Sequence, residues 1–165
     1  MPWTIVTERS DIRFGYTIDG EERQGTFLEF SGRGRLGADT RADPALIFRI
    51  RTDSIDLGNA LVSAYATSSE WFDSRNHPHA IYRLTGLETA SGGDYAATGD
   101  LMIKGRTVVL QNPVDLVVEN GVARAAGTLT ISREAFGLGT EISDLLVDIG
   151  DLVTVRFELV AERAQ

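Results

Sequence analysis

The sequence predicts an all-β protein: eight antiparallel strands that curl into a barrel, with one short helix between the third and fourth strands. Apolar and polar residues alternate along most of the chain; Val153, Val155 and Phe157 form one row, with Thr154 and Arg156 between them. A period of two is typical of a strand with one buried face. Gly and Asn-Gly turn signals separate such segments, and eight strands leave room inside a closed barrel for side chains or one small ligand.

The expected strands follow one another along the whole chain. They cover residues 11–19, 24–35, 45–53, 78–88, 94–104, 107–119, 122–133 and 152–162. The short leading segment 3–6 is expected to pair with the last strand. Residues 59–69 break the alternation and form the expected helix. Residues 136–151 are irregular, glycine-containing and acidic, and loops of this length often form the rim or lid of a barrel.

Two tight turns predict the register of the central meander. Lys104-Gly105-Arg106-Thr107 has Gly at the first central position of a type II′ turn, which would pair Lys104 with Thr107. Asn120-Gly121 is the preferred type I′ pair and would join Glu119 to Val122. Both registers place apolar residues opposite apolar ones. The expected partners are Leu101 with Leu110, Ile103 with Val108, Gly99 with Asn112, Ala97 and Gly127 with Val114, and Leu116 with Ala125.

Composition limits the classes of function. The 165 residues are expected to form one domain, residues 1–165. A net charge of −8 argues against a nucleic-acid partner, which would require clustered Lys and Arg. The chain has no Cys and no apolar run near the roughly 20 residues of a spanning helix. Since the first residues lack the pattern of a signal peptide, the protein is expected to be cytoplasmic as the chain is written, or periplasmic if an N-terminal signal was removed.

The inward rows of two neighbouring strands are small at one end and large at the other. Ala97 and Gly99 precede Leu101 on one strand, while Ala125 and Gly127 precede Leu129 on another. One interpretation is that these small residues let the barrel bend or let another element approach. The other is a tapered apolar cavity at the small end. Asn112 shares the inward face and would either bind a ligand or satisfy nearby backbone beside Pro113.

Aromatic residues lie on the apolar rows of other expected strands, namely Phe14, Tyr16, Phe30, Phe48, Tyr82 and Phe157. As single residues they are typical of core packing, but as a set they would suit a long unsaturated hydrocarbon. Trp71 and Phe72 follow the expected helix and are expected at the mouth of the barrel.

No motif for bond-making chemistry emerges. His77 and His79, near Asp73, lack the further ligands of a metal site, so we expect no metal. No nucleophile elbow surrounds a serine or threonine. Asp144, Asp148 and Asp151 lack the oxygen pattern of a calcium loop and are expected to form a solvated acidic rim. We therefore expect a protein that is not an enzyme.

Seven short motifs resemble those of a known family in order and spacing. They are Trp3-Thr4-Ile5 with Ser10-Asp11-Ile12-Arg13-Phe14, Gly25-Thr26-Phe27-Leu28-Glu29-Phe30-Ser31-Gly32, Ser54-Ile55-Asp56-Leu57-Gly58, Trp71-Phe72-Asp73 with His77-Pro78, Thr98-Gly99-Asp100-Leu101-Met102-Ile103-Lys104-Gly105, Gly127-Thr128-Leu129-Thr130-Ile131-Ser132-Arg133, and Phe136-Gly137-Leu138-Gly139. Together they resemble the YceI-like family, bacterial polyisoprenoid-binding proteins with a lipocalin-like barrel.

The resemblance implies that the barrel holds an isoprenoid lipid, such as a polyprenyl chain or an isoprenoid quinone, without covalent chemistry. The ending Phe136-Gly137-Leu138-Gly139 resembles a branch found beside membrane di-haem cytochromes b, which favours a quinone and a membrane cytochrome partner. The residues expected to contact a ligand, in the interior or at the mouth, are Phe14, Tyr16, Phe30, Phe48, Trp71, Phe72, Tyr82, Ala97, Gly99, Asn112, Ala125, Gly127, Phe136 and Phe157.

Two functions of different classes stay open at this point. The first is transport or storage of an isoprenoid lipid, a hydrophobic small-molecule ligand. The second is an interaction module with a packed barrel that serves a membrane redox partner such as a cytochrome b. A pyrophosphate head group would require Arg residues such as Arg33, Arg49 or Arg75. The sequence leaves the oligomeric state open, including a homodimer.

Overall fold

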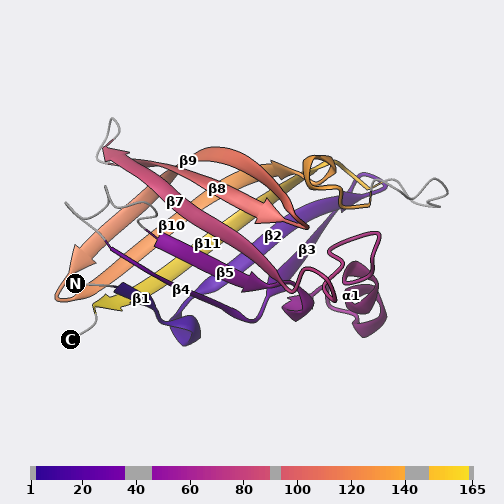
Figure 1. Ribbon diagram of the computed structural model, residues 1–165, viewed down its shortest axis with the longest axis horizontal. Coiled ribbons are helices and arrows are strands. Elements are labelled where there is room, and N and C mark those ends of the chain that lie inside the picture. The colour runs from indigo at the N-terminus through magenta and orange to yellow at the C-terminus, as the bar shows by residue number, and fades with distance from the viewer. Residues whose placement is uncertain (1–2, 36–45, 90–93, 140–148, 164–165) are drawn as a thin grey trace.

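The computed structural model describes residues 3–35, 46–89, 94–139 and 149–163 of the chain. It forms an antiparallel β-barrel with one α-helix, as the alternation predicts (Figure 1). Its strands are β1 (Trp3–Ile5), β2 (Asp11–Ile18), β3 (Glu21–Phe27), β4 (Phe30–Gly34), β5 (Leu46–Arg51), β6 (Ile55–Asp56), β7 (His79–Thr89), β8 (Tyr95–Ile103), β9 (Arg106–Glu119), β10 (Val122–Ser132) and β11 (Leu152–Arg163). The helix is α1 (Ala60–Ala66), and short 3₁₀ turns cover Thr7–Arg9, Thr52–Ser54 and Glu134–Phe136.

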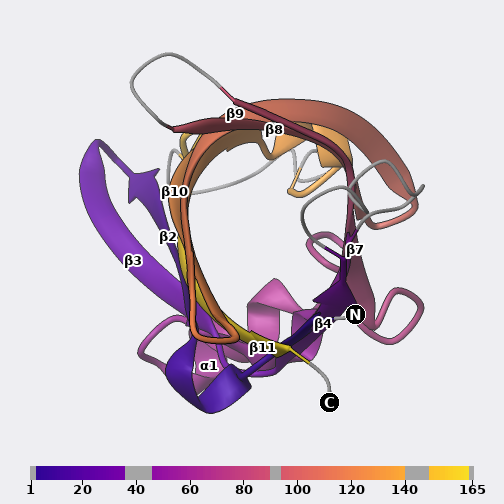
Figure 2. The same cartoon turned by 90° about the vertical axis from the view of Figure 1, so that its left-hand side faces the viewer.

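These eleven segments build a closed barrel of eight strands, because three of the strands are interrupted. β1 and β2 lie end to end on the same edge of β11, with the 3₁₀ turn Thr7–Arg9 between them. β4 then pairs with β1 and β3 with β2, while β5 pairs with β4 and β6 with β3. The pairing of β1 with both β11 and β4 closes the ring, which Figure 2 shows along the long axis. The predicted pairing of the leading segment with the last strand is thus confirmed.

The expected second strand, 24–35, is wrong as one continuous element. It begins earlier, at Glu21, because Asp19 and Gly20 adopt positive φ of 51° and 83° and form a tight turn that pairs Ile18 with Glu21. It then breaks at Leu28, whose exposed side chain leaves the barrel wall and whose N–H donates to the carbonyl of Ser54. The neighbouring third strand breaks at the same level, at Thr52–Ser54.

One of the two predicted hairpin registers is confirmed and the other is wrong. Glu119 pairs with Val122 and Leu116 with Ala125, as expected. In the other hairpin the turn residues are Lys104 and Gly105, with φ of 53° and 77°, so the turn is of type I′ rather than II′. Ile103 therefore pairs with Arg106, and the register shifts by two residues. The same residues still face inward, but their partners on β9 differ from those expected. Leu101 lies opposite Val108, Gly99 opposite Leu110 and Ala97 opposite Asn112.

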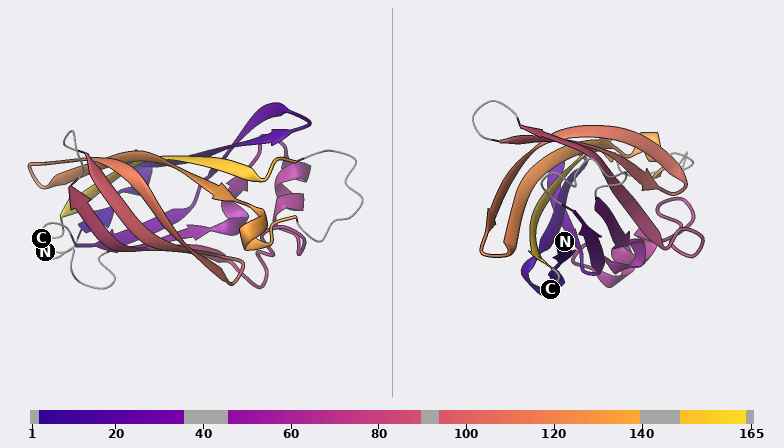
Figure 3. Two further views of the ribbon diagram at one scale, coloured as in Figure 1. Left: turned by 90° about the horizontal axis from the view of Figure 1, so that it is seen from above. Right: turned by 60° about the vertical axis from the view of Figure 1, so that its left-hand side comes forward.

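Helix α1 fills the place where the barrel wall opens. β5 pairs with β7 as far as Arg51 and His79, after which β6 pairs with β3. The helix begins after Asn59, whose side-chain oxygen accepts hydrogen bonds from the N–H groups of Leu61 and Val62 at 2.9 and 3.2 Å. Figure 3 shows α1 at one end of the barrel and both chain termini at the other. We call these the helix end and the termini end. Within the described ranges, no helix combines the length and apolarity that a membrane crossing requires.

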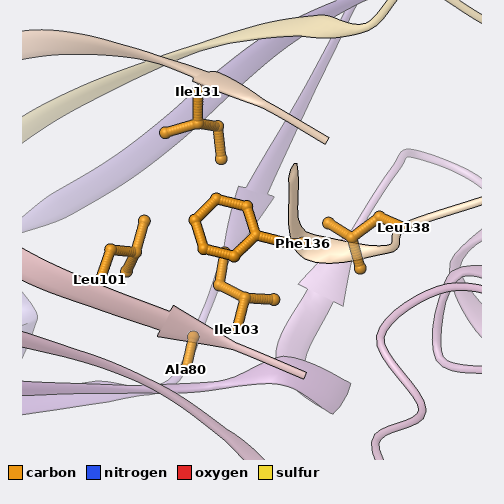
Figure 4. Packing of buried hydrophobic residues seen from close by; sticks show 6 residues of the cluster. All are labelled: Ala80, Leu101, Ile103, Ile131, Phe136 and Leu138. Atoms are coloured by element: carbon orange, nitrogen blue, oxygen red, sulfur yellow. The ribbon is translucent and has the colours of Figure 1, made fainter. Parts of the chain in front are cut away.

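A buried cluster fills one side of the helix end. Phe136 is 1% exposed and packs with Leu101, Ile103 and Ile131 (Figure 4). Gly137, at φ 74°, ends the 3₁₀ turn Glu134–Phe136 and lets the chain reverse direction after Phe136. Phe136 is therefore a core residue at the end that the Leu and Ile pattern predicts to be filled.

Candidate functional site

An apolar cavity of about 470 Å³ runs through the barrel. Its wall extends from Leu87 and Leu116 near the termini end to Tyr65 and Ile149 near the helix end. The size is within the range of about 300–1,000 Å³ that is typical of small-molecule sites. Almost every lining side chain is apolar, so the cavity can take hydrocarbon without leaving polar groups of the wall unpaired.

Most of the residues expected to contact a ligand border this cavity. Those in its wall are Phe14, Tyr16, Phe48, Trp71, Phe72, Tyr82, Ala97, Asn112, Ala125 and Phe157. Phe30, Gly99, Gly127 and Phe136 do not line it. Phe30 stacks on Phe48 instead, with ring centroids 5.6 Å apart. For all of these residues, contact with a ligand stays a prediction.

The barrel glycines make room for aromatic rings rather than for open space. A Cβ on Gly99 would overlap the ring of Tyr82 and lie 2.7 Å from the carbonyl oxygen of Arg83. A Cβ on Gly127 would lie 2.8 Å from Cζ of Phe157. Gly99 and Gly127 therefore leave no open space of their own, because rings from neighbouring strands lie over them, whereas Ala97 and Ala125 of the same small-residue rows border the cavity. The same pairing covers Gly25 with Phe14 and Gly32 with Phe48.

The cavity reaches the surface at α1. Among the lining residues that the structure describes, Val62 and Tyr65 are the exposed ones, at 45% and 48%. We therefore infer that the mouth is at the helix end. Trp71 and Phe72 lie at this end, as expected of mouth residues, but both are partly buried and pack against the cluster around Phe136. The Trp71 ring also meets that of Tyr65 edge-on, at 6.2 Å between centroids.

Among the described residues that border the cavity, one side chain is charged, and it was not among the expected site residues. Arg133 is 8% exposed, and its Nε, Nη1 and Nη2 atoms donate to the carbonyls of Gly150, Leu138 and Ile149 at 3.0, 2.8 and 2.8 Å. No carboxylate of the described residues forms an ion pair with it. The sequence carried a signal for this residue, because Arg133 continues the inward row of the strand that contains Ile131.

Asn112 and Trp71 also bring polar groups into the wall. Asn112 is buried and donates from Nδ2 to the carbonyl of Pro113 at 3.2 Å, so the backbone role left open by the sequence is observed. The indole N–H of Trp71 is buried, and none of the described residues accepts a hydrogen bond from it. The guanidinium carbon of Arg133 lies 5.8 Å from the centroid of the Trp71 ring. The polar groups Arg133 and Trp71 are thus neighbours near the helix end.

Burial raises the pKa of Tyr82 to about 12, with a smaller contribution from the nearby carboxylate of Asp100. An unfolded tyrosine loses its proton near its ordinary value of 10.0, so between pH 10 and about 12 the folded state holds more protons than the unfolded state. Stability should therefore fall as the pH rises through this window. We expect the urea midpoint of Tyr82→Phe to fall less steeply between pH 10 and 12 than that of wild type. Equal slopes would contradict the assignment.

The sequence predicts no metal site. In the ranges described, no group of three His, Cys, Asp or Glu side chains could hold an ion. A pyrophosphate head group would require Arg residues such as Arg33, Arg49 or Arg75. All three are exposed, and none borders the cavity. Of the acidic rim, Asp144 and Asp148 lie outside the described residues, while Asp151 accepts a hydrogen bond from Ser132 at 2.8 Å.

A closed antiparallel barrel around an apolar, ligand-sized cavity defines the lipocalin-like class of protein folds. The chain belongs to the YceI-like family, because the model of the YceI-like domain matches residues 3–161. No curated protein is significantly similar to it in sequence.

Solved structures share this fold. BcnA of Burkholderia cenocepacia is 26% identical, with a TM-score of 0.83 over 94% of this chain and 98% of that one. A polyisoprenoid binding domain from Saccharophagus degradans, implicated in plant cell wall breakdown, is 17% identical, with a TM-score of 0.80 over 98% of both chains. The YCEI protein of Campylobacter jejuni is 16% identical, with a TM-score of 0.71 over 86% of this chain and 85% of that one.

Proposed function

We propose that this protein binds an isoprenoid lipid in the barrel cavity and carries or stores it without chemical change. The observation that carries the proposal is the apolar cavity of about 470 Å³, which opens at α1. Membership of the YceI-like family and the polyisoprenoid binding named for the Saccharophagus domain support the class of ligand. A hydrocarbon chain gains roughly 25 cal/mol for each Å² removed from water, before the costs of association.

The head group of this lipid lies at Arg133 in our proposal. A guanidinium has five N–H donors, and three of those of Arg133 are used by backbone carbonyls. A carbonyl or hydroxyl oxygen of a quinone or alcohol would accept from the others. A pyrophosphate carries more negative charge than one buried cation can balance, and the protein itself has a net charge of −8. The proposal therefore favours a neutral head group, with an isoprenoid quinone as the leading candidate.

Ionic strength tests this choice of head group. We expect the affinity for an isoprenoid quinone to change less than about twofold between low and high salt, since apolar burial is not screened. The matched titration uses a polyprenyl pyrophosphate of the same chain length and should show weaker binding. Preference for the pyrophosphate, together with a steep loss of its binding in salt, would overturn the neutral head group.

Native mass spectrometry of protein purified from its own host, followed by lipid extraction, tests the function itself. We expect a mass increment that disappears on organic extraction and matches an isoprenoid lipid in the extract. An empty barrel from the host, or a bound lipid with straight acyl chains, would contradict the proposal.

A further inference from the structure

Helix α1 presents apolar side chains to the outside of the molecule. Leu61 is 82% exposed, and Val62 and Tyr65 on the same helix are about half exposed. The surrounding segment, residues 57–69, contains no charged residue, although 24% of the chain is charged. Leu61, Val62 and Tyr65 together expose an apolar area with no charge around it. Apolar patches of this kind are typical of surfaces that bind a partner.

This patch is continuous with the mouth of the cavity. Val62 and Tyr65 face both the outside and the cavity, whereas Leu61 does not line the cavity. A hydrocarbon chain that enters at α1 would therefore pass from the apolar surface of the helix into the apolar cavity without crossing exposed charge.

From this geometry we propose that α1 docks on the surface of a lipid bilayer, so that the isoprenoid lipid passes between bilayer and cavity along the helix. The inference rests on the proposed function, because long isoprenoid lipids reside in membranes. Leucine and valine insert among acyl chains, and tyrosine suits the interface, where its ring is apolar and its hydroxyl is wet. Seven residues are too few for a stable protein interface, which takes about 20–30 residues on each side, but they suffice for shallow insertion.

The charges beside α1 select the kind of bilayer. Glu29, Asp53 and Asp56 lie along the depression at the start of the helix. Two cations of the described residues lie beside them, and both already have partners: Arg51 pairs with Glu29 and Asp53 at 3.8 and 2.7 Å, and Nζ of Lys104 donates to the carbonyl of Ser69 at 2.7 Å. Because basic residues are what attract peripheral proteins to anionic lipids, this surface should prefer zwitterionic head groups.

The experiment measures association with phosphatidylcholine vesicles by flotation. Leu61→Ser removes an apolar side chain that touches neither the cavity nor the core, and we expect about tenfold weaker association, the factor for losing the burial of one leucine. Val109→Ser is the matched control, since Val109 is 68% exposed on β9 and does not border the cavity. It should associate like wild type. Adding phosphatidylglycerol to the vesicles should weaken association rather than strengthen it.

A second measurement separates this inference from the function on which it rests. Leu61→Ser should keep wild-type affinity for a short-chain isoprenoid quinone in solution but exchange quinone with vesicles more slowly. If wild type binds the quinone yet ignores vesicles, docking is overturned and the function stands. If it binds vesicles but no isoprenoid, the proposed function falls. A wild-type dimer that Leu61→Ser converts to monomer in sedimentation, or stronger binding to anionic vesicles, would also overturn the docking proposal.

Discussion

Replacing Ala125 with Phe should remove ligand binding while the barrel still folds. Ala125 lies on β10 between Leu116 of β9 and Leu159 of β11, and it borders the cavity. Its side chain is partly accessible although it points inward, so the added ring has space in the cavity. The ring then occupies volume that the lipid needs. We expect at least a tenfold loss of affinity for an isoprenoid quinone, with a melting temperature within a few degrees of that of wild type.

Ala126→Phe is the matched control for this prediction. Ala126 is the next residue of the same strand, and its side chain lies on the opposite face of the sheet, beside Asp115 and Glu158. It should keep wild-type affinity. Wild-type binding by a folded Ala125→Phe variant would show that the ligand lies elsewhere than in the cavity.

The arrangement of strands was predictable because alternation and turn chemistry are local. The number of barrel strands, the helix after the third strand and the Asn120-Gly121 hairpin all follow from neighbouring residues. The register at Gly105 was not predictable from the same pattern. A slip of one residue would turn the apolar row outward, but a slip of two keeps it inward, so periodicity favours both registers equally. The positive φ of Lys104 decides between them.

The shape of the cavity was harder to predict than its chemistry. Alternation places Ala125, Phe157 and Tyr82 inside, and the structure has them in the cavity wall. Whether a glycine opens space depends on a ring from another strand, and sequence separation hides that ring. Arg133 illustrates another limit: its inward position fits the period of two, yet an arginine at the end of an apolar row is usually taken as the end of the strand. Its three carbonyl partners come from segments that no local pattern connects.

Replacing Gly99 with Ala should destabilise the protein although only one methyl group is added. That methyl would overlap the Tyr82 ring and lie 2.7 Å from the carbonyl oxygen of Arg83, and a backbone oxygen in a sheet cannot move aside cheaply. Overpacking of this kind costs about 1–3 kcal/mol. We expect a fall of this size in the free energy of unfolding, measured by urea denaturation.

Gly86→Ala provides the control, because Gly86 also lies in a strand but a Cβ there would meet its nearest neighbour, Cβ of Thr98, at an ordinary 3.8 Å. It should be neutral, or more stable by about 0.4–1 kcal/mol, since alanine restricts the unfolded chain. The Tyr82→Leu background then apportions the cost: Gly99→Ala should be less destabilising there, because the ring is gone while the Arg83 oxygen remains. Equal effects of Gly99→Ala and Gly86→Ala would mean that the Tyr82 ring does not lie over Gly99 and that this part of the wall is open to a ligand after all.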